Sequence, residues 1–109
     1  MNRIDAILEH ILQDCLDIQE FISGMTEETF QENKLVRNAV GMSLINIGEL
    51  VKVLPEEFRA ENPELPWRNI AGMRDLVAHK YHTLDMVAVW NVAKNRIPEI
   101  IAFIQNYNK

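Results

Sequence analysis

The chain has 109 residues, of which 48% are hydrophobic and 25% charged, a composition that excludes a disordered protein and fits one domain spanning residues 1–109. Eleven basic and sixteen acidic side chains give a formal net charge of −5, which argues against a large nucleic-acid-binding surface and against a DNA partner. No apolar run is long enough for a membrane span, no secretion signal is visible, and the single cysteine, Cys15, cannot form an internal disulfide, so we expect a cytoplasmic protein.

A first helix is predicted from Asn2, a good N-cap residue, to Ser23, and Gly24 is expected to end it. Apolar residues recur along it at three- to four-residue spacing, which is typical of a helix with one buried face. They are Ile4, Ile7, Leu8, Ile11, Leu12, Cys15, Ile18 and Ile22. Because Cys15 falls within this stripe, we interpret it as a small core residue and not as a nucleophile.

A second, longer helix is predicted to end before Pro55 and to begin at Thr26 or at Thr29, where Glu32 would complete a capping box. Its apolar residues are Leu35, Val36, Ala39, Val40, Leu44, Ile47, Leu50, Val51 and Leu54. They cover a wide arc, which suits a helix that contacts both its own bundle and a partner.

Two glycines, Gly41 and Gly48, lie seven residues apart on one side of this helix. They could permit another helix to approach closely, although each costs about 1 kcal/mol relative to alanine inside a helix. The simpler interpretation is an ordinary core helix that tolerates both glycines.

A connector and a third helix follow. The two prolines of the segment PELP exclude regular helix between them, so residues 55–66 hold at most one short helical turn, near residues 55–60. The third helix is predicted over residues 67 to 79 or 80. Its inner face comprises Ile70, Met73, Leu76 and Val77.

The last helix is predicted to begin near Leu84 or Asp85 and to end near Asn106. Pro98 lacks an amide hydrogen, so it must kink or break this helix just before itself, near residues 95–97. The pattern as a whole predicts an all-α antiparallel bundle of four main helices, or of five if Pro98 divides the last.

The stretch MRDLVAHKYHTLD, residues 73–85, concentrates titratable side chains. On a helical wheel at about 100° per residue, Asp75 and His79 are neighbours, whereas Arg74 and His79 lie about 140° apart. Arg74 and His79 therefore cannot converge on one small target from a single straight helix. Two copies of the helix around a two-fold axis would bring the arginine of one chain to the histidine of the other, so the spacing indicates a dimeric site.

These residue types suit phosphodiester chemistry without a metal. Histidine transfers protons near neutral pH, and arginine donates a fork of hydrogen bonds to phosphate oxygens. Residues 67–82 hold three basic residues against one acidic residue, a local charge of +2. The further ligands that a tetrahedral metal site would need beside His79 and His82 are not apparent. The alternative interpretation is that these groups only cap the helix end and compensate its dipole.

The pattern Arg74-x4-His79-x-Tyr81 resembles the signature of the HEPN superfamily, in particular that of the HepT-like ribonuclease toxins paired with MntA-type nucleotidyltransferase antitoxins. The segment NIGELVKVLPEEF resembles the family's Ile-Gly-Glu segment, which closes its second long helix. The segment LPWRNIAGMRDLVAHKY resembles its Pro-Trp-Arg lead-in and motif, and VWNVAKNRIPEI is similar to its last helix. Together these segments extend the resemblance over most of the chain.

The resemblance implies an all-helical homodimer whose two motifs meet in a cleft and cleave RNA without a metal or other cofactor. The ribose 2′-hydroxyl would attack the adjacent phosphate and leave a cyclic phosphate and a free 5′-hydroxyl. His79 would be the general acid or base, Arg74 would stabilise the phosphate charge, and Asp75 would orient His79 or contact the partner chain. Glu49 is a candidate for a supporting role. Tyr81 matches the tyrosine to which the antitoxin transfers AMP, blocking the site.

Two other functions stay open from the sequence. The same cleft could belong to a non-catalytic subunit that binds a nucleotide or docks the nucleotidyltransferase, and the acidic net charge suits that function better. The chain could also be a helical oligomerisation module without chemistry of its own. A toxin should cleave RNA, whereas a binding subunit should form a tight complex with its partner and cause no toxicity when expressed alone.

Overall fold

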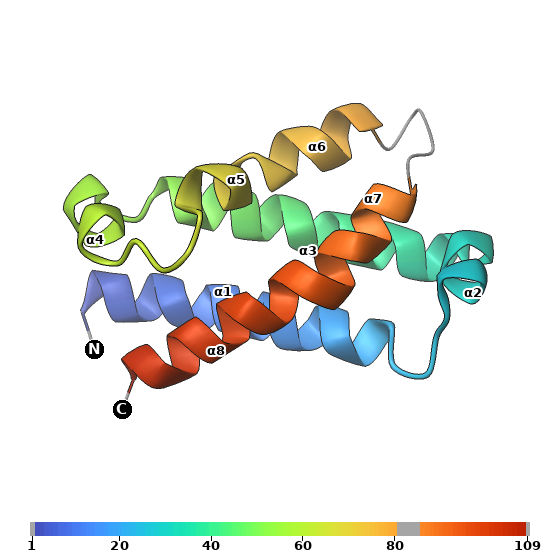
Figure 1. The fold of residues 1–109 in the computed structure, drawn as a ribbon, viewed down its shortest axis with the longest axis horizontal. Coiled ribbons are helices and arrows are strands. Elements are labelled where there is room, and N and C mark those ends of the chain that lie inside the picture. The colour runs from blue at the N-terminus through green and yellow to red at the C-terminus, as the bar shows by residue number, and fades with distance from the viewer. Residues whose placement is uncertain (1, 81–85, 109) are drawn as a thin grey trace.

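The computed structural model describes residues 2–80 and 86–108, except the side chains of Leu76, His79 and Lys80 (Figure 1). The helices are α1 (Arg3–Phe21), α2 (Glu27–Glu32), α3 (Lys34–Lys52), α4 (Glu56–Glu61), α5 (Trp67–Ala71), α6 (Met73–Lys80), α7 (Met86–Asn91) and α8 (Ile97–Tyr107). A π-helical turn, η2 (Val92–Arg96), joins α7 to α8. No strand occurs in these described ranges, which confirms the predicted all-α class.

Long helical segments form the frame of the bundle. Helices α1 and α3 run antiparallel and pack side by side, and the segment α7–η2–α8 crosses them diagonally (Figure 1). Helices α5 and α6 follow one another along α3, so α3 contacts both α1 and the segment that carries the motif. The two termini lie at the same end of the molecule (Figure 1). Among the described helices, none combines the length and the apolar character that crossing a membrane requires.

Buried apolar residues from every one of these elements join a hydrophobic core. Phe30 from α2 is fully buried, and its ring centroid lies 5.2 Å from that of Trp90 in α7. A second aromatic group centres on Phe58 of α4, whose ring centroid lies 5.8 Å from Trp67 and 6.4 Å from Phe103. This group ties α4 and α5 to α8. It therefore fixes the start of the segment that leads into the motif.

The first helix begins at its predicted N-cap and ends at Phe21, two residues before the predicted Ser23. The side chain of Asn2 accepts a hydrogen bond from the amide of Asp5 at 2.8 Å, and the carboxylate of Asp5 accepts one from the amide of Asn2. This capping box satisfies amide groups that the first turn leaves without helical partners. Beyond Phe21 the chain turns, and Gly24 has φ +76°, a left-handed conformation that glycine adopts without the strain of a Cβ atom.

The predicted single helix from Thr26 or Thr29 to Pro55 is wrong, because the chain breaks at Asn33 into α2 and α3. Thr26 is the N-cap of α2, with its hydroxyl accepting from the amide of Thr29 at 3.2 Å. The alternative capping box, Thr29 with Glu32, does not form. Asn33 takes an extended conformation, and its side chain accepts from the amide of Val36 at 3.0 Å to start α3. Asparagine favours such caps because its short amide competes with helical hydrogen bonds.

The two later helices also differ in detail from the prediction. The short turn expected near residues 55–60 is α4, and the third helix divides at Gly72 into α5 and α6. In the last helix the amide of Ile97 donates to the carbonyl of Val92, five residues back. This π-turn directly precedes Pro98, so the predicted distortion before the proline is confirmed. The predicted helix start near residues 84–85 lies outside the described residues.

Cys15 is fully buried in α1, and this burial raises the pKa of its thiol to about 12, with the nearby Asp14 carboxylate adding to the effect. Because the thiolate is the reactive form, we expect the native thiol to react with a disulfide reagent at pH 8 at least about 10³-fold more slowly than a free cysteine. Kinetics of labelling in buffer and in denaturant measure this. Rapid labelling of the folded protein would contradict the core interpretation of Cys15.

Candidate active site

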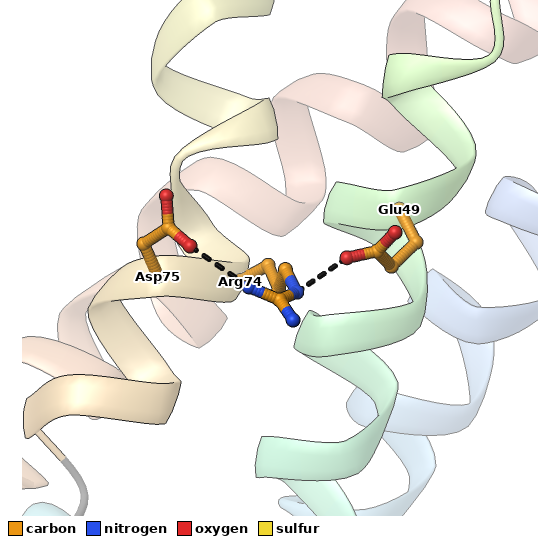
Figure 2. A network of polar contacts seen from close by, with 3 residues as sticks. All are labelled: Glu49, Arg74 and Asp75. Carbon is orange, nitrogen blue, oxygen red and sulfur yellow. Dashed lines mark hydrogen bonds and ion pairs between the residues drawn. The ribbon is translucent and has the colours of Figure 1, made fainter.

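Arg74 lies in the first turn of α6 between two carboxylates (Figure 2). Its Nε forms an ion pair with Oε1 of Glu49, which comes from α3. Its Nη1 lies 3.1 Å from Oδ1 of its neighbour Asp75. The three side chains are 44%, 52% and 55% exposed, in the order Arg74, Glu49, Asp75, so solvent and a ligand can reach all of them.

This arrangement depends on Gly48, which lets α6 approach α3 closely. A Cβ atom built on Gly48 would lie 2.9 Å from Cβ of Arg74, 3.0 Å from its backbone nitrogen and 3.1 Å from the carbonyl oxygen of Ala71. No side chain fits there without a shift of backbone. The close-approach interpretation of Gly48 is therefore confirmed, and Gly48 fixes the position of Arg74 beside the carboxylate of the next residue, Glu49.

The ion pairs that Arg74 makes with Glu49 and Asp75 still allow it to bind another anion. Ion pairs between exposed side chains contribute only about 0–1 kcal/mol, because water screens both charges. The two observed contacts use the Nε and Nη1 atoms, and a guanidinium has five N–H donors in all. Donors thus remain for an anion such as a phosphate. Arg74 is held in place by Glu49 and is still available to bind.

We expect Gly48→Ala to lower the free energy of unfolding by about 1 kcal/mol. Overpacking costs about 1–3 kcal/mol, and the gain in helix propensity, about 1 kcal/mol, offsets part of it. Urea denaturation measures the change. Gly72→Ala is the matched control, since its Cβ would meet the nearest atoms at 3.4 Å, and it should not destabilise. Equal stabilisation by both substitutions would contradict the close packing of α6 on α3.

The other predicted site residues are placed only in part. The backbone of His79 lies in α6, and its side chain is outside the described residues, as are Tyr81 and His82. The role predicted for Asp75, to orient His79 or to contact a partner chain, therefore stays a prediction. The contact of Asp75 with Arg74 was not predicted, because adjacent helical residues normally point apart.

Glu49 was predicted only as a supporting residue, and its partner was not named. The structure supplies the partner, which is Arg74. The sequence contains one signal of this pairing, which is Gly48, the residue before Glu49. A helical glycine that lets another helix approach closely places the next side chain at the edge of the contact between the two helices. Among the described residues, no three His, Cys, Asp or Glu side chains lie close enough together to hold a metal ion.

Comparison with known proteins gives matches over most of the chain. Residues 11–107 match the model of the family described as ribonuclease HepT-like. A candidate RNase of Caldanaerobacter subterraneus subsp. tengcongensis is 41% identical over 93 residues, covering 85% of this chain and 83% of the relative. A candidate RNase of Methanocaldococcus jannaschii is 42% identical over 97 residues, covering 89% and 80%. A candidate ribonuclease HepT of Thermococcus cleftensis is 37% identical over 93 residues, covering 85% and 84%.

No solved structure gives a significant match. The sequence matches alone decide the family, and they include α3 and α6, the two helices that join Glu49 to Arg74. The relatives are aligned over most of their own length as well as most of this chain. The chain therefore belongs to the ribonuclease HepT-like family, as its motif and flanking segments predicted.

Proposed function

We propose that this protein is a metal-independent endoribonuclease, the toxin of a toxin–antitoxin pair, with Arg74 and His79 as its catalytic residues. The observation that carries the proposal is the exposed guanidinium of Arg74, held by Glu49 across the α3–α6 contact in a chain of this family. The relatives are named as candidate RNases, which supports RNA as the substrate.

In the proposed reaction the ribose 2′-oxygen attacks the adjacent phosphorus, and the bond from phosphorus to the 5′-oxygen of the next nucleotide breaks. The 2′-hydroxyl proton goes to a base, and the leaving 5′-oxygen takes a proton from an acid. His79 performs one or both of these transfers. Arg74 donates to the phosphate oxygens, whose charge grows in the transition state. The products are a 2′,3′-cyclic phosphate and a free 5′-hydroxyl.

The proposal includes a homodimer that builds the site from two chains. Arg74 and His79 are separated on the wheel, so the arginine of one chain acts with the histidine of its partner. One stripe of α3 carries residues seven apart, Leu35, Met42 and Glu49, and the first two are apolar side chains exposed by 80% and 60%. A second chain that covers this stripe would lie next to Glu49 and thus next to Arg74, which supports the shared site.

The proposed partner of the dimer is a nucleotidyltransferase antitoxin of the MntA type, which transfers AMP from ATP to the phenol oxygen of Tyr81 and releases pyrophosphate and the phenol proton. An added AMP near Arg74 and His79 would bring a phosphate of its own into the site and exclude RNA. We place both proteins in the cytoplasm.

Digestion of RNA in the presence of EDTA tests the proposal. Unmodified protein should cleave, and each upstream fragment should end in a 2′,3′-cyclic phosphate, detectable by mass spectrometry. Intact-mass measurement of protein expressed with and without the nucleotidyltransferase identifies the modified form, which should carry AMP on the Tyr81 peptide and should not cleave. If neither form cleaves RNA, or if EDTA abolishes cleavage, the metal-independent ribonuclease proposal is wrong.

A second candidate function is a non-catalytic subunit that binds a nucleotide or docks the nucleotidyltransferase. The observation that favours it is electrostatic, because the chain has a net charge of −5 and Arg74 is flanked by two carboxylates. Such a protein should bind its partner tightly and leave RNA intact. Expression of the chain alone should then cause no growth arrest, whereas the toxin should arrest growth unless the antitoxin is present.

A further inference from the structure

A hollow of about 440 Å³ lies between α5 and the π-turn η2, outside the Arg74–Glu49 contact. Its lining residues come from three elements and a break between helices. They are Arg68, Asn69, Gly72, Met73, Val92 and Arg96. Two of the six carry a positive charge, and none carries a negative charge, in a chain whose formal net charge is −5.

The positive charge of this hollow is local, because another hollow on the same molecule is acidic. A hollow of about 470 Å³ beside α8 is lined by Glu64 and Glu99 and by no basic residue. An anion is repelled by that acidic hollow and attracted by the one that contains Arg68 and Arg96. The basic hollow is therefore the one of the two that suits phosphate.

Of the two cations of the hollow, Arg68 is the one that has no carboxylate partner among the described residues. Its neighbour Trp67 is buried, and the indole nitrogen of Trp67 donates to the carbonyl of Asn62 at 2.8 Å, which anchors the start of α5. The side chain of Arg68 is exposed, and no carboxylate among the described residues lies within ion-pair distance of it. The Pro-Trp-Arg segment thus joins a fixed tryptophan to an arginine that no described carboxylate pairs with.

The positive charge of Arg96 is less available to a ligand than that of Arg68, because Arg96 is paired with Glu99. Its Nη1 lies 2.8 Å from Oε2 of Glu99 in the first turn of α8, and its side chain is 31% exposed. The π-turn places Arg96 and Val92 on the wall of the hollow. Such turns occur frequently at functional sites. The remaining donors of the Arg96 guanidinium can supplement Arg68.

Two of the residues that line the hollow directly precede Arg74 of the motif in sequence. Gly72 and Met73 line it, and the next residue is Arg74. We propose that the hollow between α5 and η2 is a phosphate subsite, in which Arg68 and Arg96 bind an RNA backbone phosphate beyond the one that is cleaved. This inference rests on the proposed ribonuclease function, and it makes Arg68 an RNA-binding residue that takes no part in the bond-breaking step.

The test measures RNA binding separately from cleavage. The full chain carrying His79→Ala is titrated into a fluorescent single-stranded RNA over a range of salt concentrations, with and without Arg68→Ala. We expect Arg68→Ala to weaken binding about 5- to 10-fold, as expected for loss of one hydrogen-bonding partner at a solvent-exposed site. The logarithm of the RNA association constant falls with the logarithm of the salt concentration. The slope of this plot should become shallower by about 0.7 per subsite, which is the contribution of one phosphate contact on single-stranded RNA.

Arg3→Ala is the matched control, because Arg3 is an exposed arginine at the start of α1 and its loss changes the net charge equally. Arg96→Ala should weaken binding less than Arg68→Ala, since Glu99 already pairs with Arg96. In the otherwise unchanged protein, Arg68→Ala should raise KM for RNA and leave kcat unaltered. Circular dichroism of each variant verifies that the fold is retained.

The outcomes separate this inference from the function on which it rests. If the unmodified protein fails to cleave RNA, the ribonuclease proposal fails, whereas the binding titration still reports on the hollow. Equal binding by the Arg68→Ala and Arg3→Ala variants, with equal salt slopes, would overturn the subsite. A fall in kcat at unchanged KM would also overturn it, since that would give Arg68 a role in the reaction step.

Discussion

Replacing His79 with alanine is expected to reduce RNA cleavage about 10²- to 10⁴-fold, the range that a general acid or base supplies. Replacing Arg74 with alanine should cost about 10²- to 10³-fold, because a donor aimed at the developing phosphate charge is lost. Initial rates on one RNA substrate measure both effects. Arg74→Ala retains the Cβ atom that packs against Gly48, so the fold should survive and stability should change by at most about 1 kcal/mol.

Matched controls for these two variants are present in the chain. His10 is an exposed histidine on α1, for which we predict no role in catalysis, and His10→Ala should leave the rate unchanged. Arg3→Ala serves the same purpose for Arg74. Unchanged cleavage by His79→Ala or Arg74→Ala, in protein whose helical content and unfolding midpoint are preserved, would remove that residue from the catalytic assignment.

Replacing Glu49 with alanine is expected to lower kcat about 10- to 100-fold and to leave RNA binding unweakened. Glu49 holds the Nε of Arg74 from a different helix, and without it the guanidinium can turn away. A displacement of about 1 Å of a positioned group can reduce a rate about 10²-fold. Binding should not suffer, because the substitution removes a negative charge that repels phosphate.

The split between kcat and KM separates this positioning role from a simple charge effect. Glu9→Ala removes one exposed carboxylate from α1, away from Arg74, and should change neither constant. Glu49→Gln keeps an oxygen that can accept from Nε, so it should recover part of the lost rate. If Glu49→Ala raises kcat, or if it weakens RNA binding while kcat is unchanged, Glu49 does not position Arg74.

The helices could be predicted from the sequence wherever local chemistry alone decides them. The cap at Asn2, the turn at Gly24 and the distortion before Pro98 follow from single residues and their immediate neighbours. The break at Asn33 could not be predicted in this way. No apolar residue lies between Phe30 and Leu35, so the apolar pattern does not decide between one helix and two. Phe30 is buried against Trp90, a contact between distant parts of the chain that no local pattern specifies.

The candidate site likewise has features that the sequence predicts and features that depend on tertiary packing. Its residue types and the five-residue spacing from Arg74 to His79 are properties of the sequence, and they predict a phosphate site shared between chains. The pairing of Arg74 with Glu49 joins residues 25 positions apart and depends on how closely α6 packs on Gly48, which no local pattern specifies. The charge of the hollow at Arg68 also depends on tertiary packing, since η2 supplies Arg96.

Mixing the two inactive variants tests the shared ribonuclease site most directly. Arg74→Ala and His79→Ala chains are unfolded, mixed in equal amounts and refolded, and RNA cleavage is compared with that of the unmodified protein treated alike. Heterodimers should form about half of the dimers, each with one intact arginine–histidine pair, so the mixture should recover about a quarter of the unmodified rate. Cleavage by the unmodified protein with none by the mixture would contradict a site built from two chains, and no cleavage by the unmodified protein would contradict the ribonuclease itself.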